Sequence, residues 1–124
     1  MIKLIIMAKR KKGMSLEDFN RYWREKHGRL VMNTPDFARH IRRYVQCHKT
    51  NLSNSGFFSA SSEFDGVGEL WFDDIESMER AFSEPQYLNV VRPDELNFVD
   101  LEGCRVIITE EIPQYAPEGS AVTR

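Results

Sequence analysis

The chain has 124 residues, of which 41% are apolar and 29% are charged. This composition is typical of one globular domain and excludes a disordered or fibrous protein. The formal net charge of −2 argues against a general nucleic-acid binder, and the local basic run at positions 9–12 is interpreted as a solvated turn rather than an anion site.

The first segments of the chain predict a strand followed by a helix. Ile2–Ala8 is a continuous apolar run of strand length, which is typical of a strand buried on both faces. Ser15, with Asp18 three residues later, resembles a capping box that begins a helix. Gly28 is expected to end or bend this helix. Its apolar stripe consists of Leu16, Phe19, Trp23, Leu30 and Val31.

A second strand and a loop follow. Arg39–Lys49 alternates with period two, which predicts a strand. One face of this strand would carry His40, Arg42, Tyr44, Gln46 and His48. The segment 50–62 is rich in Ser, Asn and Gly. We expect it to be a mobile loop whose two aromatic residues, Phe57 and Phe58, cover a neighbouring part of the molecule.

The second half predicts a strand, a helix and a final strand. Gly66–Phe72 has strand character, and Asp73 with Glu76 is expected to cap a helix that carries Ile75, Met78 and Phe82 on one stripe. Pro85 and Pro93 bracket a short helical piece, 86–91, and residues 94–99 continue it as another turn. Cys104–Thr109 predicts the last strand. Residues 113–124 lack apolar periodicity and are expected to form a C-terminal arm.

This order of elements is the split β-α-β pattern of an α+β, ferredoxin-like fold, with one domain over residues 1–112. Such a fold has a four-stranded antiparallel sheet with helices on one face only. An uncovered apolar sheet face of several hundred Å² is rare on a monomer, so we expect a homodimer in which a second copy covers it.

His27 is the first candidate for chemistry. It lies on the apolar stripe of the first helix, four residues after Trp23, where a core residue would ordinarily stand. One interpretation is a histidine that caps the helix end or hydrogen-bonds a neighbour. The other is a general acid or base at the edge of a pocket, because imidazole titrates near neutral pH.

The second strand and its neighbour supply further candidates. Tyr44 and His48 project from one face roughly 13 Å apart along the strand, so they either line opposite ends of one ligand or serve as an ordinary sheet aromatic and a surface residue. Asp65 and Glu69 are the acidic candidates, and a carboxylate alternating with Val67 and Trp71 either faces solvent or enters the pocket. The aromatic residues suit a flat substrate, although core packing explains them as well: Phe19, Tyr22, Trp23, Phe57, Phe58 and Trp71.

Several classes of site are missing from the sequence. Cys47 and Cys104 are isolated, so neither a disulfide framework nor a metal site is indicated, and no phosphate loop or nucleophile turn occurs. Elimination leaves cofactor-independent reactions: decarboxylation next to a carbonyl, aldol-type cyclisation, isomerisation or loss of water. The apolar stretch Leu4–Ala8 is too short for a membrane span or signal core, so we expect a cytoplasmic protein without membrane or nucleic-acid partners.

Two runs of sequence resemble the EthD family over about residues 2–112. The first is 8–19 with Tyr22-Trp23 and 26–31, and the second is 65–72 followed by 83–88. This resemblance implies a dimeric α/β barrel. Residues 44–48, Thr50, Asp65-Gly66 and 91–95 are similar to fungal polyketide-tailoring proteins assigned as atrochrysone carboxylic acid decarboxylases. Methylmuconolactone isomerase is a more distant relative, in which the positions of His27 and Tyr44 belong to a pocket.

The resemblance implies a cofactor-free lyase that decarboxylates an aromatic polyketide acid. A cyclase or isomerase, a cofactor-free monooxygenase, and a non-catalytic binding subunit are the alternatives. In this interpretation His27 is the proton donor or base, Tyr44 and His48 hold the carboxylate or carbonyl, and Asp65 orients a histidine. The remaining candidate substrate-binding residues are Trp23, Trp71, Phe19 and Glu69. Segment 51–62, which finds no match, is expected to influence substrate choice.

Overall fold

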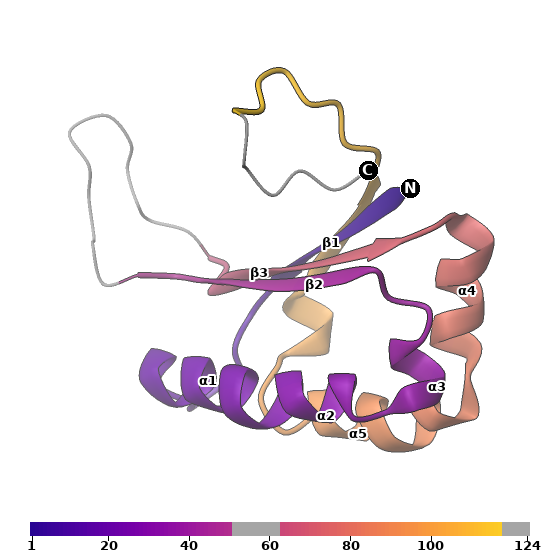
Figure 1. The fold of residues 1–124 in the computed structure, drawn as a ribbon. Helices are drawn as coiled ribbons and strands as arrows, with labels where there is room; N and C mark the ends of the chain where they lie inside the picture. Colours follow the sequence, from indigo (N-terminus) through magenta and orange to yellow (C-terminus); the bar gives the residue numbers. More distant parts are fainter. Residues whose placement is uncertain (51–62, 118–124) are drawn as a thin grey trace.

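The apolar run at the start of the chain forms a central strand of a four-stranded antiparallel sheet (Figure 1). In the computed structural model, which describes residues 1–50 and 63–117, β1 (Ile2–Ala8) lies between β3 (Gly66–Phe72) and β4 (Arg105–Thr109). β2 (Arg43–His48) pairs with the other edge of β3, which gives the order β2-β3-β1-β4. This is the strand order of a ferredoxin-like fold, as the sequence predicts.

One long helical segment follows β1. It consists of α1 (Leu16–Tyr22), a π-helical turn η1 (Trp23–His27) and α2 (Gly28–Met32). The hydroxyl of Ser15 accepts a hydrogen bond from the backbone N–H of Asp18 at 3.0 Å, which confirms the predicted cap. Gly28 does not end the helix as the sequence suggests, because it has helical dihedral angles and the helix continues to Met32.

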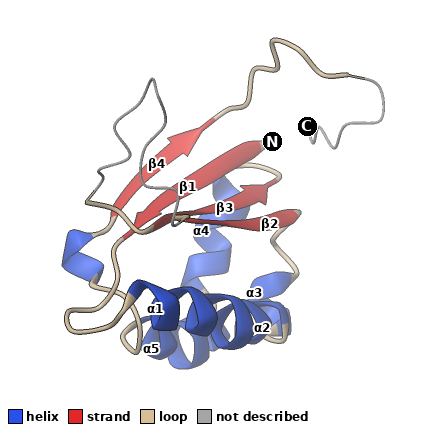
Figure 2. Cartoon of the chain, turned by 90° about the vertical axis from the view of Figure 1, so that its left-hand side faces the viewer, coloured by secondary structure: helices blue, strands red, loops and turns tan. Residues whose placement is uncertain are grey.

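The other helices lie on the same side of the sheet. They are α3 (Pro35–Ala38), α4 (Ile75–Ser83), the π-helical turn η2 (Tyr87–Val91), α5 (Arg92–Glu95) and the 3₁₀ turn η3 (Leu101–Gly103). Figure 2 shows α1, α2, α3 and α5 gathered below one face of the sheet. The cap of α4 is Asp74, whose carboxylate accepts from the N–H of Ser77, and not Asp73 as predicted. Asp73 instead pairs with Arg42.

Strand β2 is shorter than the alternating pattern predicts. It begins at Arg43, and the residues before it form a turn. His40 is buried there and hydrogen-bonds Glu84 at 2.9 Å, while Arg42 binds Asp73. Two polar side chains that the sequence assigns to one face of a strand therefore tie this turn to the two ends of α4.

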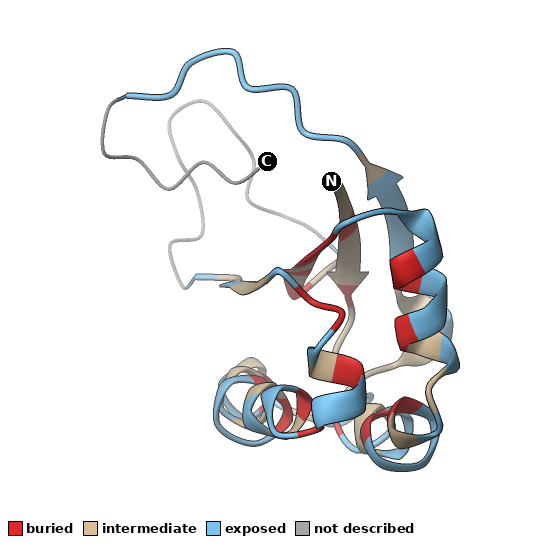
Figure 3. Ribbon diagram, turned by 45° about the vertical axis from the view of Figure 1, so that its right-hand side comes forward, coloured by how far each residue is buried: buried red, intermediate tan, exposed pale blue. Residues whose placement is uncertain are grey.

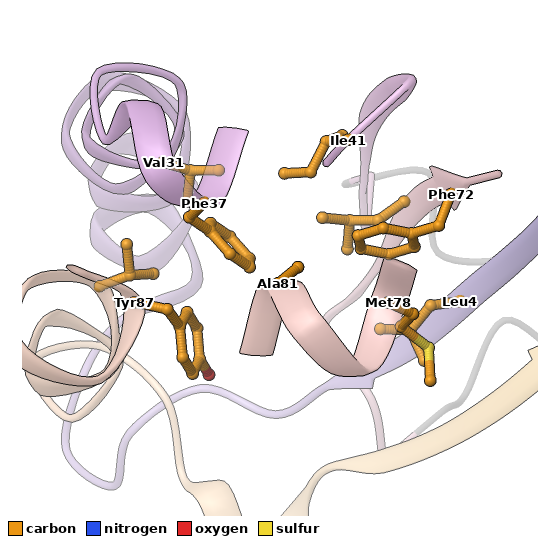
Figure 4. Packing of buried hydrophobic residues seen from close by; sticks show 10 residues of the cluster. Leu4, Val31, Phe37, Ile41, Phe72, Met78, Ala81 and Tyr87 are labelled. Carbon is orange, nitrogen blue, oxygen red and sulfur yellow. The ribbon is translucent and has the colours of Figure 1, made fainter. Parts of the chain in front are cut away.

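The core lies between the sheet and the helices. Figure 4 shows its larger cluster, in which Phe72 of the sheet packs toward Met78 and Ala81 of α4. A smaller cluster consists of Ala8, Phe19, Trp23 and Phe98. Burial is therefore concentrated on the sides of the helices that face the sheet, whereas β4 and the chain after it are largely exposed (Figure 3). Replacing one buried aromatic residue of either cluster with alanine would lower the free energy of unfolding by on the order of 3–5 kcal/mol.

Strand register divides the sheet into two faces. Tyr44, Gln46 and His48 share the inner face, toward the helices, with the even-numbered residues of the paired strands β1, β3 and β4. The outer face carries Lys3, Glu69, Trp71 and Ile107 among others, and within the described residues no helix covers it. That open face fits the expected homodimer, which stays a prediction for this chain.

Candidate active site

A cavity of about 340 Å³ separates the inner face of the sheet from the two π-helical turns. Most of its wall is apolar, contributed by residues such as Leu4, Val31 and Leu70. Among these apolar residues stand a few polar and titratable groups. They are His27, Tyr44, Tyr87, Arg92, Glu95 and Cys104. A largely apolar cavity with a few convergent polar groups is the usual form of a small-molecule site.

His27 enters the cavity wall from the end of η1, and Asp94 of α5 holds it from behind. Its side chain is 9% exposed, and the Nδ1 atom lies 2.9 Å from Oδ2 of Asp94. Burial lowers the pKa of His27, and the hydrogen bond and charge of Asp94 oppose this effect without reversing it. The imidazole is therefore neutral near pH 7. Because Nδ1 donates its hydrogen to the carboxylate, Nε2 carries the lone pair of a general base.

Asp94 is itself fixed as an ionised acceptor. Its second oxygen accepts hydrogen bonds from the hydroxyl of Tyr22 and from the amide of Asn97. Burial alone would raise the pKa of Asp94, but the hydrogen bonds from Tyr22, His27 and Asn97 outweigh it and hold the pKa below its usual value. The carboxylate therefore stays charged and orients His27 in one tautomer, as a carboxylate behind a catalytic histidine commonly does.

Glu95, the next residue along α5, has a raised pKa, whereas the pKa of Asp94 is lowered. It accepts hydrogen bonds from the hydroxyl of Tyr87 at 3.1 Å and, more weakly, from Arg92 at 3.4 Å. Burial raises the pKa of Glu95 despite these partners. Burial and the charge of Glu95 also raise the pKa of Tyr87 to about 12. Two titratable groups whose environments push them in opposite directions, His27 and Glu95, thus line one cavity.

The Tyr44 hydroxyl has a hydrogen that it can donate to a ligand. The side-chain amide of Gln46 donates to the backbone carbonyl of Trp23 at 2.9 Å, which fixes the orientation of that amide. The same nitrogen donates to the Tyr44 hydroxyl at 2.8 Å. Since the hydroxyl oxygen accepts this bond, its own hydrogen is left for another acceptor. Burial raises the pKa of Tyr44, so the phenol keeps that hydrogen near neutral pH.

Gly28 makes this arrangement sterically feasible. A Cβ atom there would lie 2.9 Å from Nε2 of Gln46, closer than real contacts allow. The carbonyl that Gln46 reaches belongs to the π-helical turn, where it also accepts from the N–H of Gly28. The glycine that the sequence suggests as a helix end therefore leaves room for the close approach of a β2 side chain, and a larger residue there would make the Gln46 side chain shift.

The structure brings three of the predicted site residues to the cavity. His27, Tyr44 and Trp23 line it. His48 lies next to it, because its ring stacks on Trp23 at a centroid distance of 4.7 Å and an interplanar angle of 6°. Their predicted roles in binding or catalysis stay predictions.

Two predicted residues lie on the opposite face of the sheet. Glu69 forms an ion pair with Lys3, and the Trp71 indole donates to Glu111 while the cationic ends of Lys3 and Arg43 lie over its ring. Neither lines the cavity. The strand register sends odd-numbered β3 side chains outward, which decides the question left open for Glu69 and places Trp71 away from His27. Their predicted roles in substrate binding stay predictions.

Asp65 and Phe19 have structural contacts instead of contacts with the cavity. The Asp65 carboxylate accepts from the backbone N–H of Arg10 at 2.9 Å, so it ties the end of β1 to the start of β3 and does not orient a histidine. Phe19 is fully buried behind the cavity wall, where its ring packs against Trp23 and Phe98. The predicted pair Phe57 and Phe58 lies outside the described residues.

Sequence reasoning missed the acidic residues that matter most to this geometry, Asp94 and Glu95. The available signals were the run Val91 to Glu95, which carries the family resemblance, and the four-residue spacing of Tyr87, Val91 and Glu95. Cys104 was also not predicted as a cavity residue, and burial raises the pKa of its thiol, which disfavours a thiolate nucleophile.

No group of three or more metal-ligating side chains occurs in residues 1–50 and 63–117. Over the same ranges no helix is long and apolar enough to cross a membrane.

Comparisons with known proteins place this geometry in context. Residues 11–102 match the model of the EthD domain. The chain is similar to dehydratase aurZ of Gibberella zeae, with 28% identity over 108 residues, 81% of this chain and 70% of that protein. It is also similar to the conidial pigment biosynthesis dehydratase EthD of Metarhizium robertsii, with 31% identity over 104 residues, 78% of this chain and 72% of that protein.

Solved structures with similar folds include an EthD family protein from Bacillus halodurans. Its TM-score is 0.65 at 21% identity, over 90% of this chain and 99% of that chain. A dimeric protein with a ferredoxin-like fold from Bacteroides fragilis has a TM-score of 0.63 at 11% identity, over 89% of this chain and 95% of that chain. At these identities the likeness shows the fold alone, which is ferredoxin-like.

Proposed function

Because the chain belongs to the EthD domain family, we propose that it is a polyketide-tailoring lyase that removes water from a fused-ring aromatic precursor by acid–base chemistry. The single observation that carries the proposal is the buried His27–Asp94 pair in the wall of an apolar cavity. Two relatives named as dehydratases support elimination of water as the reaction. The apolar, aromatic-rich wall suits a flat ring system.

The proposed reaction starts from a ring that carries a ketone and, two carbons away, a hydroxyl group. His27 Nε2 removes a proton from the carbon next to the ketone, and the electrons of that C–H bond move toward the carbonyl oxygen. The Tyr44 hydroxyl donates a hydrogen bond to this oxygen as its negative charge develops. The enolate then re-forms the ketone, a carbon–carbon double bond appears, and the carbon–oxygen bond to the hydroxyl breaks.

Glu95 supplies the proton for the leaving hydroxyl. Its raised pKa favours the protonated carboxyl in the cavity, so the departing oxygen leaves as water and the carboxyl becomes a carboxylate. The proton on His27 returns to Glu95 before the next turnover, and the net reaction is the loss of one water. Each correctly placed acid or base contributes typically 10²–10⁴-fold to such a rate.

Decarboxylation is the reaction that the narrower sequence resemblance favours, and it would use the same Tyr44 donor. The enolate left after loss of carbon dioxide needs a proton on carbon, which a protonated Glu95 would equally supply, so the two relatives named as dehydratases, and not this carboxyl group, favour loss of water. An isomerase, a cyclase, a monooxygenase or a binding subunit would use the same cavity. Product mass separates loss of water, loss of carbon dioxide and addition of oxygen. An isomerase and a binding subunit both leave the mass unchanged, and the chromatographic retention of the product separates those two.

The test is mass spectrometry of the purified protein with a hydroxylated, partly reduced anthracenone carboxylic acid. We expect accelerated loss of one water relative to a no-protein control, and a rate reduced roughly 10²–10⁴-fold in His27→Gln. Arg29→Gln is the matched control, because Arg29 is exposed on the same helical segment. A folded His27→Gln protein with the wild-type rate would contradict the mechanism. Loss of carbon dioxide, or retention of unchanged ligand, would replace dehydration by a decarboxylase or a binding module.

A further inference from the structure

A second hollow, of about 530 Å³, opens beside the cavity and is lined by Arg24, Tyr44, Gln46 and His48. Tyr44 lines both spaces. We propose that this hollow binds a carboxylate substituent of an aromatic ligand whose rings occupy the cavity. The inference rests on the proposed function, because it assigns a substrate class to the same site, namely fused-ring aromatic acids.

The lining of the hollow has the chemistry of an anion site. The guanidinium of Arg24 is positively charged and the imidazole of His48 can become so, while the amide of Gln46 and the neutral phenol of Tyr44 add no negative charge. The Arg24 guanidinium is largely exposed and is approached by Glu25 at 3.7 Å. An exposed ion pair at this distance contributes little, so it is readily exchanged for a ligand carboxylate. Arginine is well suited to this ligand because its planar fork matches both carboxylate oxygens.

The hydrogen-bond network gives His48 a defined orientation. The Gln46 amide nitrogen donates to the Trp23 carbonyl, so its Oε1 atom can only accept, and His48 Nε2 donates to it at 2.7 Å. In the neutral ring Nδ1 is therefore an acceptor, and in the protonated ring it is a second donor. Burial and the charge of Arg24 lower the pKa of His48. A carboxylate bound between Arg24 and His48 would oppose both effects and favour the protonated ring.

The stacked indole of Trp23 supports that protonated state. The His48 ring lies parallel to the Trp23 ring at 4.7 Å, where a positive charge is attracted by the indole face. Trp23 also forms part of the cavity wall. A ligand that spans both spaces would therefore contact Trp23 and Tyr44 with its rings and Arg24 and His48 with its carboxylate.

This placement bears on the reaction. A carboxylate paired with Arg24 is stabilised in the ground state, and that stabilisation is lost if the group leaves as carbon dioxide, which raises the barrier to decarboxylation. Loss of water at the ring is not affected in this way. The hollow therefore favours a reaction in which the carboxylate serves to position the substrate and is retained in the product.

The test measures binding, so that it does not depend on turnover. Calorimetry compares 2-naphthoate with the uncharged 2-naphthamide for the wild type, Arg24→Gln, Arg24→Lys and the control Arg29→Gln. We expect the wild type and Arg29→Gln to prefer the carboxylate. Arg24→Gln should weaken naphthoate binding roughly tenfold, the equivalent of one charge-assisted hydrogen bond, and leave naphthamide binding unchanged. Arg24→Lys should recover part of the loss.

Equal affinities of the wild type for the acid and the amide, or equal weakening of both ligands by Arg24→Gln, would overturn the subsite. The ¹⁵N spectrum of His48 gives a second readout, because naphthoate and not naphthamide should move its Nδ1 signal toward the protonated value. An unmoved signal would remove His48 from the subsite. A protein that passes these tests and yet leaves the anthracenone acid unchanged would refute the lyase proposal alone.

Discussion

Replacing Asp94 with asparagine changes the hydrogen position on His27 while leaving almost every atom in place. Oδ1 of Asp94 accepts from the Tyr22 hydroxyl and from the Asn97 amide. The carbonyl of the new asparagine should occupy this position, because the reverse orientation would lose two hydrogen bonds of about 1 kcal/mol each. Its NH₂ group then faces Nδ1 of His27 and donates to it. The imidazole must accept there, so its hydrogen moves to Nε2.

The expected effect on rate follows from the lost lone pair. With Nε2 protonated, His27 can no longer remove a proton from the substrate, which should reduce kcat on the order of 10²–10⁴-fold. Folding should change much less, by about 1–2 kcal/mol, because a charge-assisted hydrogen bond is replaced by a neutral one of the same geometry. The charge of Asp94 also opposes the lowered pKa of His27, so the variant should lower that pKa further.

Steady-state rates of the wild type, Asp94→Asn, His27→Gln and the double variant provide the assay. The double variant should be no slower than His27→Gln, since both substitutions remove one shared function. Urea unfolding checks the stability estimate, and the ¹⁵N spectrum of His27 reports the tautomer directly. A wild-type rate in Asp94→Asn, or a His27 ring that keeps its hydrogen on Nδ1, would refute the reasoning.

Three other predictions follow from the same structure. The rate should fall at low pH as His27 becomes protonated, with a pKa below the ordinary 6.5. It should fall again at higher pH as Glu95 ionises, with a pKa above the ordinary 4.5, and Glu95→Gln should lack this second fall. Gly66→Ala should destabilise the fold by about 1–3 kcal/mol in urea unfolding, since its Cβ would lie 2.6 Å from the Trp23 ring, whereas Gly68→Ala has room at 3.6 Å. Ile107→Glu, on the uncovered outer face, should yield a monomer in light scattering; a persisting dimer would locate the interface elsewhere.

The fold could be predicted because periodicity and capping residues agree along most of the chain. The apolar run 2–8, the Ser15 cap and the strand character of 66–72 each correspond to the observed element. The start of β2 could not be predicted, because the alternating sequence pattern continues through His40 and Arg42 although the chain turns there. Contacts with Glu84 and Asp73, more than 30 residues away in sequence, hold that turn, and a local pattern does not contain them.

The site was predictable only where one residue type was out of place. His27 on an apolar stripe is such a case, and Tyr44 follows from the strand that carries it. The face on which Glu69 and Trp71 lie could not be predicted, because alternation shows that two faces exist but not which one meets the helices. Asp94 and Glu95 are neighbours with opposite pKa shifts. That difference comes from Tyr22, Tyr87 and the cavity wall, and therefore from tertiary contacts.

Residue spacing is a second sequence signal for the site. Phe19, Trp23, His27 and Val31 follow one another at strict four-residue intervals. All four are buried. In an α-helix each four-residue step advances about 400°, so three steps would rotate the stripe by about 120° and carry Val31 away from the face that Phe19 occupies. The π-helical turn at Trp23–His27 accommodates one extra residue, which removes about 100° of that rotation and keeps the stripe on one face.

The second π-helical turn repeats this device across the cavity. Tyr87, Val91 and Glu95 are also four residues apart, all three line the cavity, and η2 spans the first step. An α-helix of the same sequence would turn Glu95 about 80° away from the direction of Tyr87, which donates a hydrogen bond to it. The helical segments that carry His27 and Glu95 thus each contain one extra residue at the cavity. The inserted residues turn both His27 and Glu95 toward the cavity, which an unbroken α-helix would not do.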